Sequence, residues 1–183
     1  GNAGVIGEGD VQWMTAGSGL LHKEYHEENF SKSGGLFQMV QLWVNLPAKY
    51  KKTKPKYQDL KKELQGRYLL PDGLGEVAVI AGEFKGTKGA AYTFSPMQVY
   101  NLKLKKGANL ELSFPKTDNT GMLMIEGEAK VNDETAKTDH FVLFNHDGDV
   151  IQVTATEDAA MLILSGEPIN EPIAAYGPFL MNT

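Results

Sequence analysis

The segment Gly9-Asp-Val-Gln-Trp-Met-Thr-Ala-Gly-Ser-Gly-Leu-Leu-His22-Lys-Glu24 carries the strongest structural signal in this chain of 183 residues. It predicts a turn and a strand that run into a glycine-rich bend, after which a histidine and a carboxylate follow two residues apart. Residues i and i+2 of an extended segment point to the same side, so His22 and Glu24 would face the same space. A metal ion usually takes three or four protein ligands, and these two residues are therefore half of a candidate metal site.

Composition limits the other possibilities. Hydrophobic residues make up 42% of the chain, with eight Phe and seven Tyr, which is enough for a packed core. Cysteine is absent, so any metal must be held by His, Asp or Glu. A net charge of −5 gives no reason to expect direct binding to nucleic acid. No apolar run is long enough for a membrane span and no secretory leader opens the chain, so we expect a cytoplasmic protein that does not contact membranes.

The prevailing hydrophobic period is two, which predicts an all-β fold. In Leu36-Phe-Gln-Met-Val-Gln-Leu-Trp-Val-Asn-Leu46 the even positions from Val40 to Leu46 are all apolar, and this pattern predicts a strand with one fully buried face. Further strands are expected within residues 76–84, 100–105, 110–114, 122–125, 140–144, 150–153 and 160–164. Turn sequences separate them, including Pro71-Asp-Gly73, Lys106-Gly107, Glu126-Gly127 and Asp147-Gly-Asp149.

A lysine-rich segment between Pro47 and Pro55 predicts a linker, because its prolines would stop a strand on either side. Residues 57–65 carry apolar side chains at Tyr57, Leu60 and Leu64, a spacing that predicts a short helix in this connector. The roughly 120 residues that follow contain enough strand signals for a closed sandwich or barrel. Residues 1–48 are too few for an independent core, so we expect them to be the end of a domain whose beginning is missing.

Four motifs of this chain resemble those of the pirin family, in the same order. The first is the run Gly4-Val-Ile-Gly-Glu-Gly-Asp-Val-Gln-Trp-Met-Thr-Ala-Gly-Ser-Gly-Leu-Leu-His-Lys-Glu24. The others are Gln41-Leu-Trp-Val-Asn-Leu-Pro47, Tyr57-Gln-Asp59, and Ser165-Gly-Glu-Pro-Ile-Asn-Glu-Pro172 with Gly177-Pro-Phe-Leu-Met-Asn-Thr183. The resemblance is specific, because four separate motifs agree and the first is long and unusual.

The resemblance implies two tandem cupin barrels (double-stranded β-helix, or jelly-roll), with one mononuclear metal ion, usually iron, in the first. On this basis residues 1–48 are the C-terminal part of the metal-binding cupin, the first one being incomplete here. Residues 49–65 are the interdomain linker, and residues 66–183 are the C-terminal cupin, expected to be free of metal. Pirins carry a His-x-His pair upstream of the segment where this chain opens, so we expect two further histidines before Gly1, and a continuation after Thr183.

The resemblance makes His22 and Glu24 metal ligands, and Glu24 also a candidate catalytic base. The sequence supports these roles, since the small residues Ala16, Gly17 and Gly19 allow a tight entry into the bend. The His-x-Glu spacing alone is a weak pattern, and two exposed loop residues would be its ordinary explanation. Tyr25 and His26 replace the Met-Pro that commonly follows the glutamate in the family, so the local loop shape is expected to differ.

Other candidates are weaker. His26 with Glu27 and Glu28 could add a ligand or move protons, although a solvated acidic loop is the simpler interpretation. His140 and His146 have no second histidine at ligand spacing, and the expected ligand positions of the second cupin hold residues such as Phe114, Pro115 and Lys116. The lysines at 49, 51, 52, 54 and 56 are more typical of a solvated linker than of a surface for an acidic partner. Trp13 and Trp43 are expected to pack in the core, with a part in lining a substrate cavity as the alternative.

Three functional hypotheses follow from the resemblance. Many bacterial pirins are similar to quercetin 2,3-dioxygenases, in which the metal binds the 3-hydroxy-4-keto group of a flavonol, a carboxylate assists its deprotonation and O₂ cleaves the central ring. This hypothesis makes the protein an Fe²⁺-dependent oxidoreductase with an aromatic small-molecule substrate. Eukaryotic pirins resemble transcription co-regulators of the cytoplasm and nucleus, which implies a non-catalytic, iron-responsive module with a regulatory protein partner. A metal-free scaffold is the third hypothesis.

Overall fold

The computed structural model of the protein describes residues 3–183 and divides the chain into two compact units. Unit 1 combines Gly1–Lys62, from residue 3 onward, with Ile169–Thr183, and unit 2 is Glu63–Pro168. The sequence motifs instead predict that residues 169–183 belong to the second domain and that residues 49–65 form a linker. Those boundaries follow motif positions, whereas the units follow contacts, and the predicted domain division stays a prediction.

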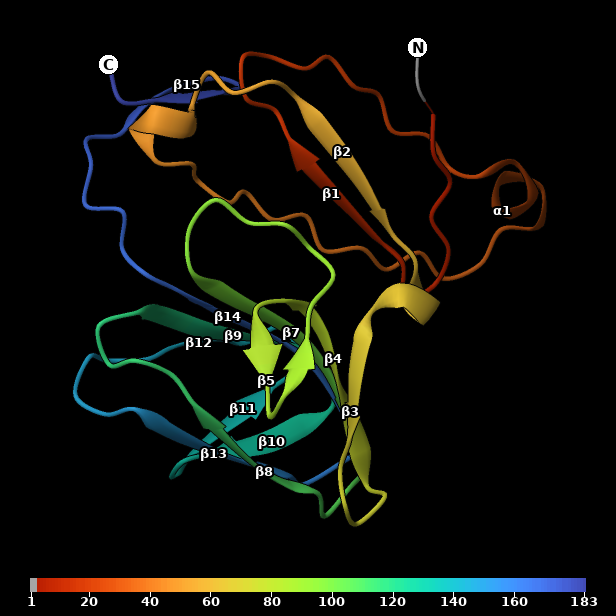
Figure 1. The fold of residues 1–183 in the computed structure, drawn as a ribbon. Coiled ribbons are helices and arrows are strands. Elements are labelled where there is room, and N and C mark those ends of the chain that lie inside the picture. The colour runs from red at the N-terminus through yellow and green to blue at the C-terminus, as the bar shows by residue number, and fades with distance from the viewer. Residues whose placement is uncertain (1–2) are drawn as a thin grey trace. The chain divides into compact units, whose positions relative to one another are not determined.

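Unit 1 is built on one antiparallel pair of strands, β1 (Val11–Thr15) and β2 (Lys56–Leu60). The pairing runs from Val11 opposite Leu60 to Thr15 opposite Lys56, and both Thr15 and Leu60 are buried. A second hairpin joins β15 (Ala174–Tyr176) to β16 (Phe179–Met181). Much of the remaining unit consists of loops, as Figure 1 shows for the red and orange parts of the chain.

The carboxylate of Asp10 ties the start of β1 to the end of β2. Its two oxygens accept the backbone N–H groups of Gly7 and Lys62, both at 2.9 Å, and the Lys61 ammonium lies 3.1 Å away. These backbone hydrogen bonds, from Gly7 first and then Lys62, lower the pKa of Asp10 below its ordinary value against the opposing effect of burial. The carboxylate thus closes the open end of the two-stranded pair.

Unit 2 is a sandwich of two antiparallel sheets. The larger sheet has the strand order β12-β9-β14-β7-β4-β3 and the smaller one has the order β11-β10-β13-β8 (Figure 1). A small hairpin pairs β5 with β6. The bounds are β3 (Gly66–Leu69), β4 (Gly75–Ala81), β5 (Glu83–Phe84), β6 (Thr87–Lys88), β7 (Met97–Leu104), β8 (Asn109–Ser113), β9 (Asn119–Glu126), β10 (Glu128–Val131), β11 (Glu134–Lys137), β12 (Phe141–Leu143), β13 (Val150–Ala155) and β14 (Ala159–Gly166).

The core of unit 2 lies between the two sheets and follows from alternation along the strands. In β8, Leu110 and Leu112 are buried while Glu111 between them is exposed. The neighbouring strand β13 of the same sheet pairs Val153 with Leu110 and Ile151 with Leu112, so the buried positions of both strands coincide. From the larger sheet the fully buried side chains include Leu102, Met122, Met124, Met161 and Ile163. The resulting interior is apolar, and the expected strands of this region are confirmed.

The chain passes from the larger sheet to the smaller one at Gly127. This glycine lies between β9 and β10 with φ +76°, and a Cβ atom there would be 2.0 Å from the carbonyl oxygen of Asp158. Only glycine combines this backbone conformation with so close an approach. The turn predicted at Glu126-Gly127 is therefore the point at which the sheet becomes a sandwich.

A row of aromatic rings runs along the inside of unit 2. Tyr68, Phe84, Tyr100 and Phe114 follow one another with centroid distances of 5.2, 5.6 and 5.9 Å. The Tyr100 hydroxyl lies 2.7 Å from both the Glu83 carbonyl oxygen and Gln98 Oε1. Burial, and after it the charge of Glu83, raises the pKa of Tyr100, so this hydroxyl stays protonated and acts as a hydrogen-bond donor.

The strand predicted over residues 36–46 is wrong for the described structure. The segment is not part of any sheet formed by residues 3–183, and Leu36 and Trp43 are 88% and 65% exposed. The even positions Val40, Leu42 and Val44 are also exposed, so the expected buried face is absent from the described chain. The alternation is present in the sequence, but a strand also needs a neighbouring strand for its backbone hydrogen bonds, and alternation does not supply one.

The helix predicted over residues 57–65 is also wrong, because residues 57–60 belong to strand β2. Pairing with β1 satisfies its backbone groups, and only Lys62–Leu64 forms a single 3-10 turn. The other helical elements are α1 (Glu28–Ser33) and the 3-10 helix Ala48–Tyr50. Within residues 3–183, none of the helices has the length and apolar character needed to cross a membrane.

The core of unit 2 yields a first prediction. Leu112 is fully buried, so Leu112→Ala should lower the free energy of unfolding by about 2–5 kcal/mol, through lost burial and the cavity left behind. Leu69→Ala, at an edge-strand position that is 69% exposed, is the matched control and should change it by less than about 0.5 kcal/mol. Urea unfolding followed by circular dichroism measures both, and equal losses would contradict this description of the core.

The Asp10 cluster yields a second prediction, on pH. Because its folded-state pKa is depressed, Asp10 stabilises unit 1 above its unfolded pKa, about 3.9, and this contribution disappears as pH falls through the folded value. Asp10→Asn should therefore be less stable than the parent protein at neutral pH and show a smaller further loss on acidification. Both tryptophans, Trp13 and Trp43, belong to unit 1, so tryptophan fluorescence in urea reports this unit. Asp59→Asn, which removes an exposed carboxylate 3.4 Å from Lys61 Nζ, is the control and should keep the acid-dependent loss.

Candidate metal centre

The glycine-rich bend that precedes the candidate ligands is fixed against the loop before β2. The Ser18 N–H donates to the Thr53 carbonyl oxygen at 2.8 Å. Gly17 has φ +51°, and a Cβ atom at this position would be 2.1 Å from the same oxygen. The glycine is thus required both by its backbone conformation and by the close approach of the two segments. This contact fixes the bend that connects β1 to residues 20–24.

His22 and Glu24 lie on the same side of an extended segment. His22 Nε2 is 3.8 Å from Glu24 Oε1, and the two side chains are 46% and 44% exposed. The segment is not in a strand, and the side chains do not face the interior of a barrel within the described residues, which differs from the expectation. The structure does bring an imidazole nitrogen and a carboxylate oxygen together.

The chemistry of this pair fits a metal ion as a partial donor set. Two donors that each bind at about 2.1 Å can be at most about 4.2 Å apart on one ion, and 3.8 Å lies inside that limit. One nitrogen and one oxygen suit a borderline divalent ion such as Fe²⁺. In residues 3–183 no cluster of three or more His, Asp or Glu side chains could hold an ion, so the described chain offers this pair only as a partial set of candidate ligands. Their role as ligands stays a prediction.

His26, Glu27 and Glu28 have structural roles in the short helix α1. The Glu27 carboxylate accepts the backbone N–H of Phe30 at 2.9 Å and caps the helix. Backbone hydrogen bonds from Asn29 and then Phe30 lower the pKa of Glu27. The His26 ring packs against Phe30 and Phe37, with centroids 5.6 and 4.9 Å away. These contacts give Glu27 a capping role and His26 a packing role.

The histidines of unit 2 lie apart from its interior. His140 and His146 are exposed, and His140 Nδ1 accepts the Lys137 N–H at 3.3 Å. A row of uncharged polar side chains crosses three neighbouring strands of the larger sheet, in which Gln98 is the register partner of Ser165 and Ser165 that of Thr120. The Thr120 and Ser165 hydroxyls are 2.9 Å apart, and Ser165 donates to Asp118 Oδ2 at 3.3 Å. Gln98 Oε1 instead accepts hydrogen bonds from the Glu83 N–H and the Tyr100 hydroxyl.

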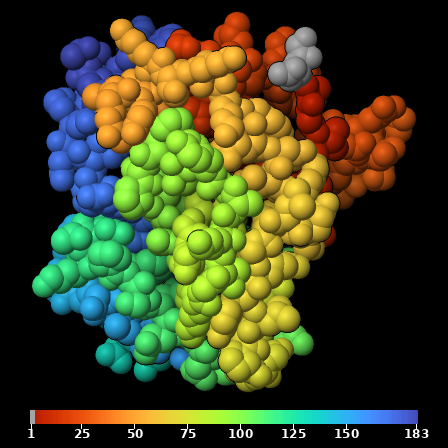
Figure 2. Space-filling view, viewed as in Figure 1, coloured from red at the N-terminus to blue at the C-terminus, as the bar shows by residue number. Residues whose placement is uncertain are grey.

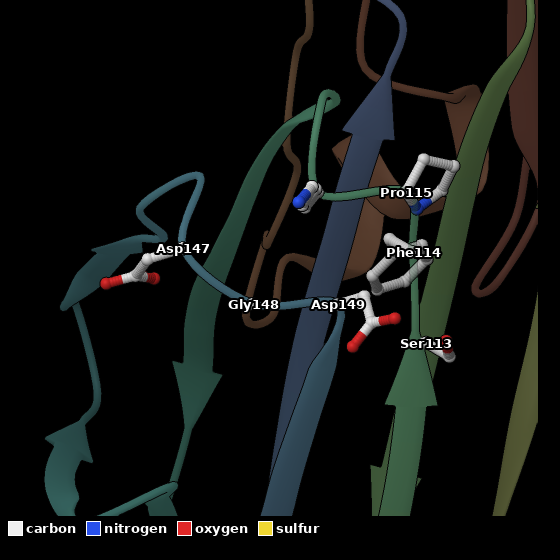
Figure 3. Close-up of a pocket in the computed structure, with 7 residues that line it drawn as sticks. Ser113, Phe114, Pro115, Asp147, Gly148 and Asp149 are labelled. Carbon is white, nitrogen blue, oxygen red and sulfur yellow. The ribbon is translucent and has the colours of Figure 1, made fainter.

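A hollow of about 620 Å³ opens at the rim of unit 2, between the end of β8 and the loop before β13. Figure 3 shows its lining, in which the Asp147 carboxylate points away from Phe114 and Pro115 while the Asp149 carboxylate lies toward Ser113. Lys116 and Gly148 complete the lining. Phe114, Pro115 and Lys116, which stand at the expected ligand positions, thus border an open surface feature. Sequence reasoning missed this hollow, because its two walls come from loops about 30 residues apart.

The remaining candidates have mixed surroundings. The lysine-rich segment, coloured orange in Figure 2, lies on the face drawn there. Lys51 is nevertheless buried and donates to Asn45 Oδ1, and the Lys49 ammonium lies 4.8 Å from the Tyr50 ring centroid. The linker interpretation therefore holds only for part of the run. Trp13 is half-buried in β1, whereas the exposure of Trp43 contradicts the predicted core packing.

The bend at Gly17 gives a third prediction. Gly17→Ala should destabilise unit 1 and displace the segment that carries His22 and Glu24, because Cβ would overlap the Thr53 carbonyl. Gly19→Ala is the control: Gly19 also has a positive φ, +127°, but no atom lies within 4 Å of its Cβ position. Urea unfolding by tryptophan fluorescence should show the larger loss for Gly17→Ala, by at least about 1 kcal/mol. Equal losses would mean that backbone conformation alone, without the contact, decides this bend.

Two known protein families match parts of this sequence. The family described as "Pirin" matches residues 1–44, and the one described as "Pirin C-terminal cupin domain" matches residues 99–183. The chain is 45% identical over its full length to "Putative quercetin 2,3-dioxygenase PA2418" of Pseudomonas aeruginosa, of which it covers 64%. It is 36% identical to "Pirin-1" of Arabidopsis thaliana and covers 63% of that protein. The chain thus spans less than two thirds of the length of these relatives.

A solved structure agrees with the sequence relatives. The crystal structure of quercetin 2,3-dioxygenase from Acinetobacter baumannii superposes with a TM-score of 0.91 at 45% identity, covering 96% of this chain and 61% of that one. The likeness extends over both units and confirms the all-β cupin fold expected from the sequence. On the combined evidence of motifs, fold and relatives, the chain belongs to the pirin family.

Proposed function

We propose that this protein binds one mononuclear metal ion, most simply Fe²⁺, through His22 and Glu24 and oxidises flavonols as a dioxygenase of the quercetin 2,3-dioxygenase type. The observation that carries the proposal is the His22–Glu24 pair, a nitrogen and an oxygen donor 3.8 Å apart on one side of the chain. A relative 45% identical and a solved structure equally similar both carry a quercetin 2,3-dioxygenase name, which supports the reaction class. The two further histidines expected from the family would complete the ligand set.

A ferrous ion held by this pair would supply a Lewis-acidic centre and the redox chemistry that reaction with O₂ requires. The described residues contribute orientation and proton transfer. His22 presents Nε2 toward Glu24, which leaves its other ring nitrogen available for a hydrogen bond that fixes the ring. Glu24 has two oxygens, and the one not used as a ligand can accept the proton of a flavonol 3-hydroxyl as a general base. The acidic 3-hydroxyl of a flavonol would therefore lie opposite the Glu24 carboxylate.

A regulatory role is the second candidate, and one observation favours it. His22 and Glu24 are almost half exposed, so a change in the charge of an ion held there would reach the protein surface and alter what binds to it. In that case Glu24 would only tune the metal and would not transfer a proton. A redox-dependent surface of this kind requires a protein partner.

The fourth prediction separates these functions by mutation. In the whole native protein loaded with Fe²⁺, His22→Ala should lower flavonol turnover by more than about 100-fold, because removal of a ligand is at least as severe as loss of its outer-shell support. Glu24→Gln should lower kcat more than metal content, since the amide can bind an ion weakly but cannot accept the proton. His146→Ala, an exposed histidine of unit 2, is the matched control and should leave both turnover and metal content unchanged.

The measurements are substrate absorbance, elemental analysis and a panel of flavonols. Full iron occupancy without turnover of any flavonol would overturn the dioxygenase proposal and favour the regulatory one. Less than about one-tenth equivalent of metal in protein purified without chelators would contradict both and leave a metal-free scaffold. Turnover that survives in His22→Ala would remove the assignment of this residue.

A further inference from the structure

The chain contains two Asp-Gly sequences, and the structure gives them opposite environments. Asp72-Gly73 lies in the turn between β3 and β4, and Asp147-Gly148 lies in the loop between β12 and β13. All four residues are exposed. Asp-Gly is the sequence at which an aspartate can most easily be attacked by the backbone nitrogen that follows it, because glycine has no side chain to hinder the approach.

Hydrogen bonds protect the first sequence. Asp72 Oδ1 accepts the Leu74 N–H at 2.8 Å, which holds the carboxylate in an Asx-turn. The Gly73 N–H donates to the Leu70 carbonyl at 2.9 Å, so the nitrogen that would have to attack is already engaged. Gly73 also has φ +71°, and this fixed turn would have to open before the nitrogen could reach the carboxyl carbon.

The second sequence has none of these restraints. Within the part of the chain that the structure describes, neither the Asp147 carboxylate nor the Gly148 N–H makes a hydrogen bond or an ion pair. The Asp147 carboxylate points away from the opposite wall of the hollow, as Figure 3 shows. No atom lies within 4 Å of the Cβ position of either Gly148 or Gly73, so hydrogen bonding and not crowding distinguishes the two sequences.

We propose that Asp147-Gly148 is a site of spontaneous isomerisation to isoaspartate, and that Asp72-Gly73 is not. The Gly148 nitrogen attacks Asp147 Cγ, the new C–N bond closes a five-membered succinimide ring, and the carboxyl oxygen leaves as water. Water then adds to either ring carbonyl and reopens the ring to aspartate or to isoaspartate. The net change is an isomerisation that consumes no oxidant or reductant and conserves mass and charge.

The consequence falls on the rim of unit 2. Isoaspartate routes the main chain through the former side chain and lengthens it by one carbon just before Asp149. The Asp149 carbonyl accepts the Phe114 N–H at 3.0 Å, and the next residue, Val150, is the register partner of Ser113. The extra atom therefore strains the first contacts between β13 and β8 and changes the wall of the hollow. It also leaves the Asp147 carbonyl as a shorter α-carboxylate at the surface.

The experiment ages the purified protein at neutral pH and physiological temperature, and then measures isoaspartate by peptide mapping and by methylation with a protein isoaspartyl methyltransferase. Isoaspartate should accumulate at Asp147 severalfold faster than at Asp72 in the same sample. Gly148→Ala is the matched variant, because φ at this position lies outside the left-handed region and an added Cβ meets nothing, so the fold should be unchanged while the rate falls. Asp147→Glu should abolish the signal at this position, since a six-membered ring closes far more slowly.

Three outcomes would overturn the proposal. They are no accumulation at Asp147, accumulation at Asp72 at an equal or greater rate, and an unchanged rate in Gly148→Ala. If Gly148→Ala alters the melting temperature, the comparison of Asp147 with Asp72 in the parent protein still decides the matter, because both sites are then measured in the same molecules. Partial unfolding in urea should raise the rate at Asp72 toward that at Asp147, which tests whether folding provides the protection.

Discussion

The two-residue repeat of extended backbone is the constraint on which both the core and the candidate site depend. In unit 2 it directs Leu110 and Leu112 to the inside and Glu111 to the outside, and the neighbouring strand β13 repeats the pattern in register. In unit 1 the same repeat puts His22 and Glu24 on one side of the chain, 3.8 Å apart. The geometry is the same, but the surroundings differ: alternation between two sheets makes a dry core, whereas alternation in an unpaired segment leaves the groups partly in water.

The two units differ in how far their polar side chains are hydrogen-bonded and buried. Inside unit 2, Thr120, Ser165 and Asp118 form a closed set of hydrogen bonds, and no buried polar side-chain atom of the described residues is left without a partner. The pair in unit 1 has one long contact and much exposed surface, so its bonding capacity is still available. The exposed, loosely paired donors of unit 1 therefore support the proposal of a metal site there.

The sequence patterns predict correctly those elements whose conformation depends on nearby residues. The strands of unit 2 and the turn at Gly127 follow from alternation and from glycine chemistry, and the structure contains them. Local patterns do not reveal pairing between segments that are distant in sequence. Residues 57–60 have the spacing of a helix but form a strand, because they pair with β1 more than 40 positions earlier. The alternation at 36–46 likewise does not show whether a neighbouring strand exists. The site shows the same division, since motif resemblance identified His22 and Glu24, whereas the approach of Gly17 to Thr53 and the capping by Asp10 required coordinates.

The methionines of unit 2 have a consequence for a protein expected to work with O₂. Met122, Met124 and Met161 are fully buried, with Met124 and Met161 directly paired across β9 and β14, whereas Met39 of unit 1 is exposed. Oxidation to the sulfoxide makes a thioether polar, and it requires access of the oxidant to sulfur. Reactive oxygen species that escape into solution would therefore reach Met39 first. Sulfoxide at the three core positions would form only in molecules whose sandwich has opened, so the pattern of oxidised methionines records whether damage preceded or followed unfolding.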